Sequence, residues 1–150
     1  MATNPNGFWN AFGAHLEAKG VPFKRPKPSP NSWMGYGLGK AGAHLIVGLT
    51  KTEAAVFVEI NNRDHLGWFS ELQDADKEIE NELGFSLEWQ KRPDKKYSFI
   101  KTAKSLDMTD KDQWIDAHDW MADKMQSFKK VFPPRLNFLS DEAGVSDGFD

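Results

Sequence analysis

Basic and aromatic side chains gather in one short stretch of the chain, WQKRPDKKYSFIKTAK, residues 89–104. Cations neutralise the phosphates of a nucleic acid, and aromatic rings stack on its bases at roughly 1–3 kcal/mol per base. The stretch therefore predicts a nucleic-acid-binding hairpin. Its candidate contact residues are Lys91, Arg92, Lys95, Lys96, Tyr97, Phe99, Lys101 and Lys104.

The charge of this stretch also has an internal interpretation. Residues 85–105 contain six basic and two acidic side chains, whereas residues 64–84 contain one basic and seven acidic side chains. Two neighbouring segments therefore carry net charges of +4 and −6. Opposite charges attract, so the hairpin can complement the acidic segment within one chain or in a second copy. Binding to a protein partner or to itself is our first hypothesis, and nucleic-acid binding is the alternative.

Six tryptophans are a second source of binding groups, at positions 9, 33, 68, 89, 114 and 120. Exposed tryptophans anchor protein interfaces. Trp114 begins one apolar stripe and Trp9 adjoins another, so we expect most of the six to pack in the core. The candidate surface for a partner or ligand is formed by Trp33, Tyr36, Glu59 and Asn61.

A nuclease site is the enzymatic alternative. The predicted order of helix, three strands, helix and strand is that of restriction-endonuclease-like nucleases. Those enzymes need an acidic residue on the second strand and Glu-x-Lys on the third, because two carboxylates hold a divalent metal while the lysine polarises water. Here the second strand, AHLIVGLT, has no acid, and the third ends in Glu59-Ile60-Asn61. We expect no catalytic residues, and a degenerate nuclease is the second alternative.

Other motifs favour structure over chemistry. Gly37, Gly39 and Gly42 match the dinucleotide-binding spacing G-x-G-x-x-G, but strand residues follow them where that motif needs a helix, so they predict a hairpin turn. The histidines lie on different elements without metal-binding spacing. Ser98 lacks the G-x-S-x-G setting of a nucleophile, and His118 fits a core histidine. We expect neither a metal nor a cofactor.

Hydrophobic periodicity predicts the elements that position these residues. Phe8, Phe12 and Leu16 recur every four residues after Asn6, and Gly20 ends that helix. Alternating apolar residues predict strands at 33–39, 43–50, 54–61, 85–92 and 97–103. One helix is expected over 64–84, with Asp64 at its start and Gly84 at its end. Another is expected from a Thr109–Asp112 capping box to Pro133-Pro134, with its apolar stripe at Trp114, His118, Met121, Met125, Phe128 and Phe132.

The order α-β-β-β-α-β-β-α predicts an α+β fold with a mostly antiparallel five-stranded sheet covered by helices. The chain has 150 residues, which is the size of one domain, and we place that domain at residues 1–136. Four prolines, at 22, 26, 28 and 30, predict an extended linker, and residues 137–150 predict a flexible acidic tail.

Composition excludes several classes of protein. The chain has no cysteine, which rules out disulfides and zinc–thiolate sites. A net charge of −3 is not that of a uniformly basic nucleic-acid binder. No stretch has the roughly 20 apolar residues of a membrane span, and the start lacks a signal peptide, so we expect a cytoplasmic location and no membrane partner.

Several phrases together resemble the family catalogued as domain of unknown function 4268. They are Ser32-Trp33 through Gly39, KEIENELGFSLEW at 77–89, PDKKYSFI at 93–100, Trp114, Asp119-Trp120 and KKVFPPRL at 129–136. Members are bacterial or archaeal, and the domain is often appended to a restriction-endonuclease-like nuclease domain. The resemblance therefore implies a setting in DNA metabolism or defence, without an assigned activity. We predict a non-catalytic interaction or accessory module in such a pathway.

The chain departs from the pattern that this resemblance implies. The family tends to have Glu and Asp on the third strand, Asn-Lys at the start of the next helix and Ser-Arg-Ile on the fifth strand. The corresponding residues here are Phe57 and Asn61, His65 and Leu66, and Ser98-Phe99-Ile100. If those groups form a site or a buried ion network in relatives, this chain has replaced it. Replacing a whole network by apolar groups can leave stability unharmed, whereas losing one partner would not.

Overall fold

The computed structural model describes residues 5–21, 23 and 32–139. The expected proline-rich linker, apart from its first residues, and the acidic tail beyond residue 139 lie outside this range. The helices are α1 (Pro5–Lys19), α2 (His65–Asp74), α3 (Asp76–Leu83), the short 3₁₀ helix η1 (Lys111–Gln113) and α4 (Trp114–Asn137). The strands are β1 (Trp33–Gly37), β2 (Ala43–Leu49), β3 (Glu53–Ile60), β4 (Glu88–Gln90) and β5 (Ser98–Ser105). The predicted α+β class and element order are confirmed.

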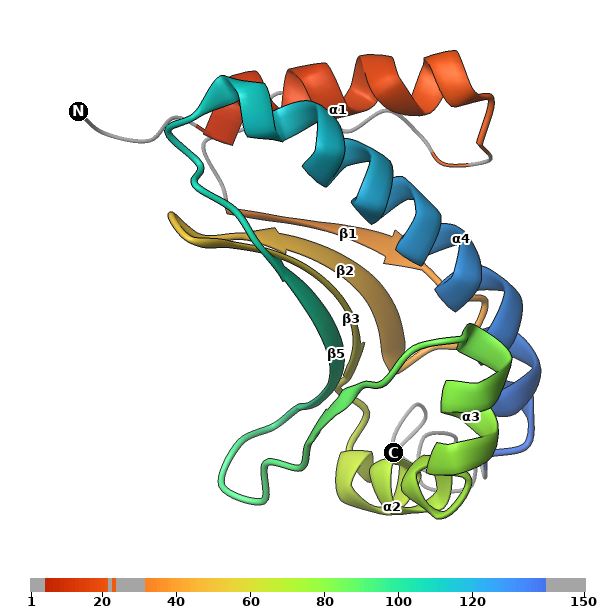
Figure 1. Ribbon diagram of the computed structural model, residues 1–150. Coiled ribbons are helices and arrows are strands. Elements are labelled where there is room, and N and C mark those ends of the chain that lie inside the picture. The colour runs from red at the N-terminus through yellow and green to blue at the C-terminus, as the bar shows by residue number, and fades with distance from the viewer. Residues whose placement is uncertain (1–4, 22, 24–31, 140–150) are drawn as a thin grey trace.

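One antiparallel sheet contains all five strands in the order β1-β2-β3-β5-β4. The first three strands form the predicted meander. Because β5 pairs with β3, the short β4 becomes the far edge, and β1 and β4 lie at opposite edges. Figure 1 shows the sheet strongly curved, with the helices on its convex side and none on its concave side.

The two faces of the sheet differ in their residues. Leu45, Val58 and Ile100 are aligned across three strands and are fully buried under the helices. Since side chains alternate along a strand, the residues between them point to the opposite, helix-free face. That face is called the open face below.

The helical layer is built around aromatic rings. Phe8, Phe12 and Leu16 of α1 are fully buried, as their spacing predicts, and helix α1 ends before Gly20, which has a φ of 68°. In α4 the predicted stripe is buried from His118 to Phe132, while Trp114 is half-buried. The two helices therefore pack through the residues that periodicity identified.

The single helix expected over 64–84 is wrong, because the chain breaks at Ala75 into α2 and α3. Ala75 leaves the helical region, with φ −107° and ψ 23°, which lets both helices bury their apolar residues on the curved sheet. The predicted ends are confirmed. The Asp64 carboxylate accepts the Gly67 N–H at 3.2 Å, and Gly84 has a left-handed φ of 89°.

The predicted limits of the last helix are also wrong at both ends. At the start, Asp110 and not Thr109 is the capping residue, and it caps the 3₁₀ helix η1 that leads into α4: Thr109 donates to Asp107, while the Asp110 carboxylate accepts the Asp112 N–H at 3.0 Å. The helix then continues through Pro133 and Pro134 to Asn137. Two prolines cost helix hydrogen bonds. Burial of Phe132 and Leu136 and the ion pairs of Arg135 with α3 offset this cost.

Candidate functional site

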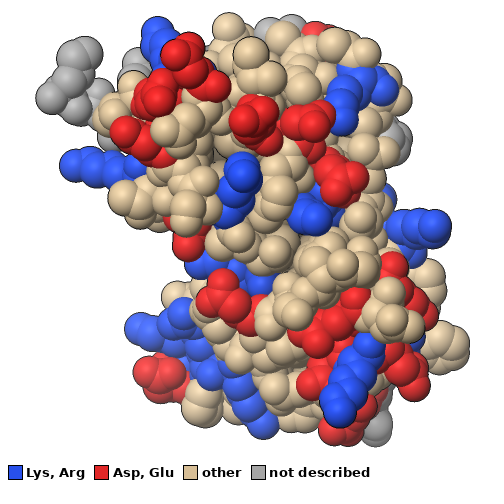
Figure 2. Space-filling model, in the orientation of Figure 1, with Lys and Arg blue, Asp and Glu red and all other residues tan. Residues whose placement is uncertain are grey.

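The open face of the sheet combines exposed and buried apolar groups. Trp33 of β1 is 55% exposed, while Phe57 of β3 and Phe99 of β5 are half-buried. Ile46 and Ala55 are buried there, yet they lie outside the main core cluster under the helices. In Figure 2 the outline of the molecule is indented on the left, the side toward which the concave face turns in Figure 1.

Three aromatic rings touch in the middle of this face. The Phe57 and Phe99 ring centroids are 4.8 Å apart, and Tyr97 stacks on Phe99 at 5.0 Å. The Arg92 guanidinium lies 5.2 Å from the Phe99 centroid, close enough for a cation–π contact. Phe57 and Phe99 are two of the positions where the family resemblance implies charged residues. An apolar contact therefore stands where that resemblance places charge.

Charged groups on the open face form one ion pair and several hydrogen bonds to neutral amides. Lys101 Nζ is 2.9 Å from Glu53 Oε2, and Asn61 Nδ2 donates to Glu59 Oε1 at 3.4 Å. Arg92 Nη2 donates to Gln90 Oε1 at 2.8 Å, while its buried Nε has no hydrogen-bond partner among the described residues. The Arg92 Nε–H is thus a buried hydrogen-bond donor beside the aromatic rings that has no acceptor among the described residues.

The basic residues of the hairpin do not share one surface. Arg92 and Lys101 flank the open face, whereas Lys104 pairs in register with Ala54 and so belongs to the helix-facing side. Lys91 Nζ donates to Ser70 of α2 at 2.9 Å. Lys95 and Lys96 are exposed at the turn, where Figure 2 shows blue side chains at the lower left. The basic side chains of the hairpin therefore point in different directions and do not form one continuous surface.

The four residues expected to form a partner surface are also divided. Trp33 and Glu59 lie on the open face, and Asn61 joins them through its bond to Glu59. Tyr36 points to the other side, where its ring meets Phe23 at 5.6 Å, and burial raises the pKa of Tyr36 to about 12. Trp33 is the exposed member of the six tryptophans; the others are buried or packed against the core.

A buried polar relay holds the hairpin in place, and sequence reasoning missed it. Ser98 Oγ accepts the Arg92 N–H at 3.1 Å and lies 2.9 Å from His65 Nδ1. The other ring nitrogen, Nε2, lies 2.8 Å from the Lys95 carbonyl oxygen. A carbonyl only accepts, so Nε2 carries the proton and Ser98 donates to Nδ1. Because Ser98 is fully buried, a substrate cannot reach its hydroxyl, and its hydrogen bonds serve to hold the hairpin.

The acidic segment is neutralised from a different direction than its charge pattern suggests. Arg135 of α4 forms ion pairs with Glu78 at 3.3 Å and Glu82 at 2.9 Å. Between residues 85–105 and helices α2 and α3, all of which are described, no ion pair is found. Among acidic side chains of that segment, Glu80 contacts the hairpin through hydrogen bonds from the Leu87 N–H and the Trp89 indole, and Lys91 donates to Ser70, so within one chain these segments meet through hydrogen bonds and longer-range attraction.

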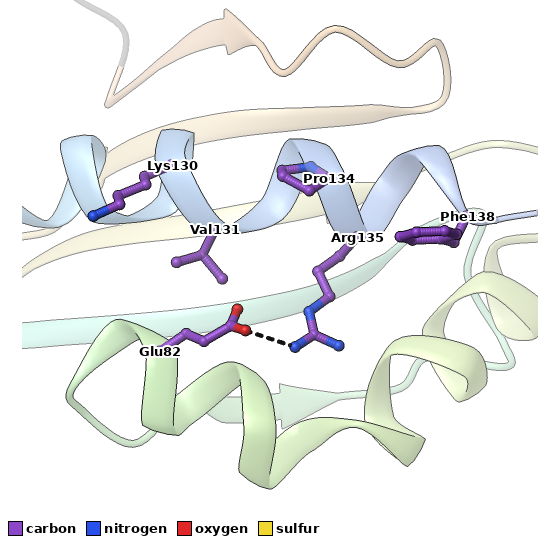
Figure 3. Close-up of a pocket in the computed structure, with 6 residues that line it drawn as sticks. All are labelled: Glu82, Lys130, Val131, Pro134, Arg135 and Phe138. Carbon is purple, nitrogen blue, oxygen red and sulfur yellow. Dashed lines mark hydrogen bonds and ion pairs between the residues drawn. The ribbon is translucent and has the colours of Figure 1, made fainter.

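A groove of about 490 Å³ runs between α3 and the end of α4. Figure 3 shows Glu82 and Arg135 joined across it, with Phe138 at one end. The Arg135 guanidinium is occupied by two carboxylates, so it is not available to fix a ligand's orientation. The open face is consequently the stronger candidate for binding.

The described residues contain no cluster of side chains suited to bind a metal ion. Within residues 5–21, 23 and 32–139, no group of three or more His, Asp or Glu side chains is placed to hold a metal ion. Glu59 has Asn61 beside it where a Glu-x-Lys nuclease motif requires lysine. None of the described helices has the length and apolar character to cross a membrane.

Comparison with known proteins identifies a family. Residues 6–136 match the family described as Domain of unknown function (DUF4268). No curated protein and no solved structure matches the chain. The matched range extends from α1 to the last full turn of α4 and includes every strand of the sheet. The chain therefore belongs to the DUF4268 family.

Proposed function

We propose that this chain is a non-catalytic interaction module that binds a protein partner through the open face of its sheet. The observation that carries this proposal is the contact cluster of Tyr97, Phe99 and Phe57 beside the exposed Trp33. Protein interfaces have an apolar, aromatic centre and a polar rim. The open face has this composition, with aromatic rings in the middle and hydrogen-bonded charges around them.

The sign of the charges favours a protein over a nucleic acid. The open face carries two cations, Arg92 and Lys101, and three carboxylates, Glu53, Glu59 and Glu88. Binding to nucleic acid derives much of its strength from neutralising phosphates, which needs an excess of positive charge. A face with more carboxylates than cations lacks that excess, and Lys101 is already paired with Glu53. Mixed charges suit the polar rim of a protein interface.

The biological setting is part of the proposal. The family resemblance implies a role in DNA metabolism or defence, and we place the interaction module in the cytoplasm of a prokaryotic cell on that basis. The structure supports the coarser statement that the described helices include no membrane span. The partner is then another protein of that setting, recognised by apolar side chains that fit against Phe57 and Phe99.

Site-specific photo-crosslinking in the source cell tests the proposal. A photoreactive phenylalanine at position 33 should crosslink one defined protein, and Phe57→Ser should abolish that product. The same photoreactive residue at Ile115, which is 70% exposed on α4, is the matched control and should give no such product. An identical product from both positions, or none from position 33, would contradict binding through the open face.

Nucleic-acid binding is the second candidate because of one specific observation. The half-buried Arg92 guanidinium lies against Phe99, and Tyr97 stacks on the same ring. A phosphate could pair with this guanidinium through a nitrogen other than the buried Nε while a base stacks on Tyr97. Gel-shift titration at 50 and 200 mM salt tests this. Retention that falls steeply with salt and disappears in Arg92→Gln would favour it, and no retention at 50 mM would exclude it.

A further inference from the structure

The outer edge of β1 presents backbone groups in a regular row. Leu49 N donates to Ser32 O at 2.8 Å, so residues 32 and 49 form a hydrogen-bonded pair of the β1–β2 ladder. In an antiparallel ladder, hydrogen-bonded pairs alternate with pairs whose N–H and C=O point away. The groups of Met34 and Tyr36 are therefore directed at β2. Those of Trp33, Gly35 and Gly37 point outward.

Few of these outward groups are satisfied within the described residues. The Gly37 carbonyl accepts Lys129 Nζ at 2.9 Å. For the N–H groups of Trp33, Gly35 and Gly37, and for the carbonyls of Trp33 and Gly35, no described residue supplies a partner. A row of unpaired N–H and C=O groups is a template for another strand.

The side chains of β1 leave this template open. Its sequence is WMGYG, with no charged residue and no proline. Charges, prolines and covering side chains are the usual means by which proteins block an edge strand. Beside the opposite edge lies a carboxylate: Glu80 Oε2 accepts the N–H of Leu87, the residue directly before β4, at 2.8 Å and the side-chain Nε1–H of Trp89 at 3.2 Å. β4 itself also contains a charged residue, Glu88, whereas β1 contains none.

We propose that β1 pairs antiparallel with β1 of a second copy of this chain. The register that joins the outward groups places Gly35 opposite Gly35 of the second copy, and Trp33 opposite Gly37 of the second copy. The three opposed pairs, 33 with 37, 35 with 35 and 37 with 33, each exchange two hydrogen bonds, which gives six. Gly37 O keeps its bond to Lys129 because a carbonyl has two lone pairs.

Side-chain size supports a second copy as the occupant. Trp33, Gly35 and Gly37 all lie on the open face, and Trp33 is 55% exposed. In the two-fold register each exposed indole lies beside a glycine of the other copy, which has no side chain to obstruct it. The strand has no charge to repel its own copy. The pairing joins two open faces into one ten-stranded sheet, since each copy contributes five strands.

This inference does not rest on the proposed partner binding, because it uses backbone groups at an edge. Sedimentation equilibrium from 5 µM to 1 mM protein is the first test. The apparent mass should rise from 17.0 kDa toward twice that value. Half-dissociation is expected on the order of 100 µM, because a five-residue strand pair makes a small interface. A chain that stays monomeric at 1 mM overturns the proposal, whatever the crosslinking at position 33 shows.

Amide hydrogen exchange identifies the surface. Raising the protein concentration to 1 mM should slow exchange about fivefold at Trp33, Gly35 and Gly37, whose N–H groups point outward, because about one fifth of the chain stays monomeric there when half-dissociation lies on the order of 100 µM. Exchange at Met34 and Tyr36 should be slow at every concentration, because these N–H groups already bond to β2. A dimer without concentration-dependent protection at the first three amides uses another surface and also overturns the proposal.

Charge substitution on the two-fold axis tests the register. Gly35 faces itself, so Gly35→Lys and Gly35→Glu should each raise the dissociation constant at least tenfold, while their equimolar mixture should restore dimers. A Cβ on Gly35 meets Ile46 Cδ1 at 3.4 Å, an ordinary contact, so both variants should fold. Gln90→Lys on the β4 edge is the matched control and should dimerise normally. Unchanged dimerisation of both Gly35 variants would contradict the proposed register.

Discussion

The two edge strands of the sheet, β1 and β4, have different side chains around them. At β4, the helix α3 supplies Glu80, which binds the Leu87 amide and the Trp89 indole. At β1, α4 supplies Lys129, whose ammonium reaches one carbonyl, that of Gly37. A carboxylate beside β4 therefore accepts from two donors, whereas at β1 the described residues provide a partner for one outward backbone group, the Gly37 carbonyl.

This difference extends into the regions next to each edge. The β4 side is fixed by buried polar groups, the relay of Ser98, His65 and the Lys95 carbonyl. The β1 side and the helices above it are fixed by aromatic packing, such as Phe23 on Tyr36 and Phe8 on Trp9. Polar contacts are directional and close an edge, whereas apolar packing holds a strand from one face and leaves its edge accessible.

The largest predicted effect comes from breaking the polar relay on the β4 side. His65→Ala should lower the free energy of unfolding by about 4 kcal/mol, because the buried Ser98 hydroxyl loses its acceptor, the Lys95 carbonyl loses its donor and the buried imidazole leaves a cavity. Urea denaturation at pH 7 measures this. His44→Ala, which removes a half-buried histidine from the open face, is the matched control and should cost much less. Equal losses would mean that the relay is not what holds the hairpin.

The second prediction concerns His118, the buried histidine in the aromatic packing between α1 and α4. Burial lowers the pKa of His118 to about 4, although its hydrogen bond to the Phe8 carbonyl acts in the opposite direction. A histidine whose folded pKa is depressed stabilises the fold least at low pH, because the unfolded chain binds the proton first. Stability should therefore fall between about pH 6.5 and pH 4, by about 3 kcal/mol from this residue.

His118→Phe isolates that contribution. The ring lies among Phe8, Phe12 and Trp114, so an apolar ring should be tolerated at pH 7.5. Comparing urea midpoints of the variant and the natural chain at pH 7.5 and 4.5 separates His118 from carboxylates that titrate in both proteins. If the two proteins lose stability in parallel on acidification, the histidine is not the acid-sensitive group. The loss of stability in acid would then not arise from the aromatic side of the molecule, where His118 lies.

Sequence patterns predicted the fold where one physical effect dominates. Periodic burial identified α1, α4 and all five strands, and Gly84 ended the α2–α3 segment as expected. The errors arose where tertiary contacts outweigh local preference. Pro133 and Pro134 do not end α4 because Leu136 is buried beyond them. Burial of a distant residue is not visible in the local signal.

The candidate site was predictable only in part. Alternation correctly placed Tyr97, Phe99 and Lys101 on one face, because side-chain direction in a strand depends on sequence parity alone. Strand order is a different matter, and it decides that Phe99 meets Phe57. The bond between His65 and Ser98 joins residues 33 positions apart, for which the sequence carries no spacing signal.

The third prediction concerns Glu80, the carboxylate beside the β4 edge. Glu80→Ala should destabilise the chain by about 2 kcal/mol, since the Leu87 amide and the Trp89 indole both lose their acceptor. Glu82→Ala is the matched control on the same helix. Its ion pair with Arg135 is exposed, so its loss should cost no more than about 1 kcal/mol. If both substitutions cost the same, Glu80 acts as a surface charge and the two edges are less different than their contacts indicate.

The smallest effect on stability is expected at the open edge itself. Trp33→Ala at 5 µM protein, where the chain is monomeric, should change the free energy of unfolding by less than about 1 kcal/mol, because an exposed side chain loses little packing. The same substitution should raise the dissociation constant of the β1-paired dimer at least tenfold, because the indole covers a glycine of the second copy. Trp33→Ala should therefore mainly weaken association, which sedimentation measures, whereas Glu80→Ala should mainly lower stability, which urea denaturation measures. A Trp33 variant that unfolds as readily as the Glu80 variant would identify the indole as a packing residue, and β1 would then be a protected edge like β4.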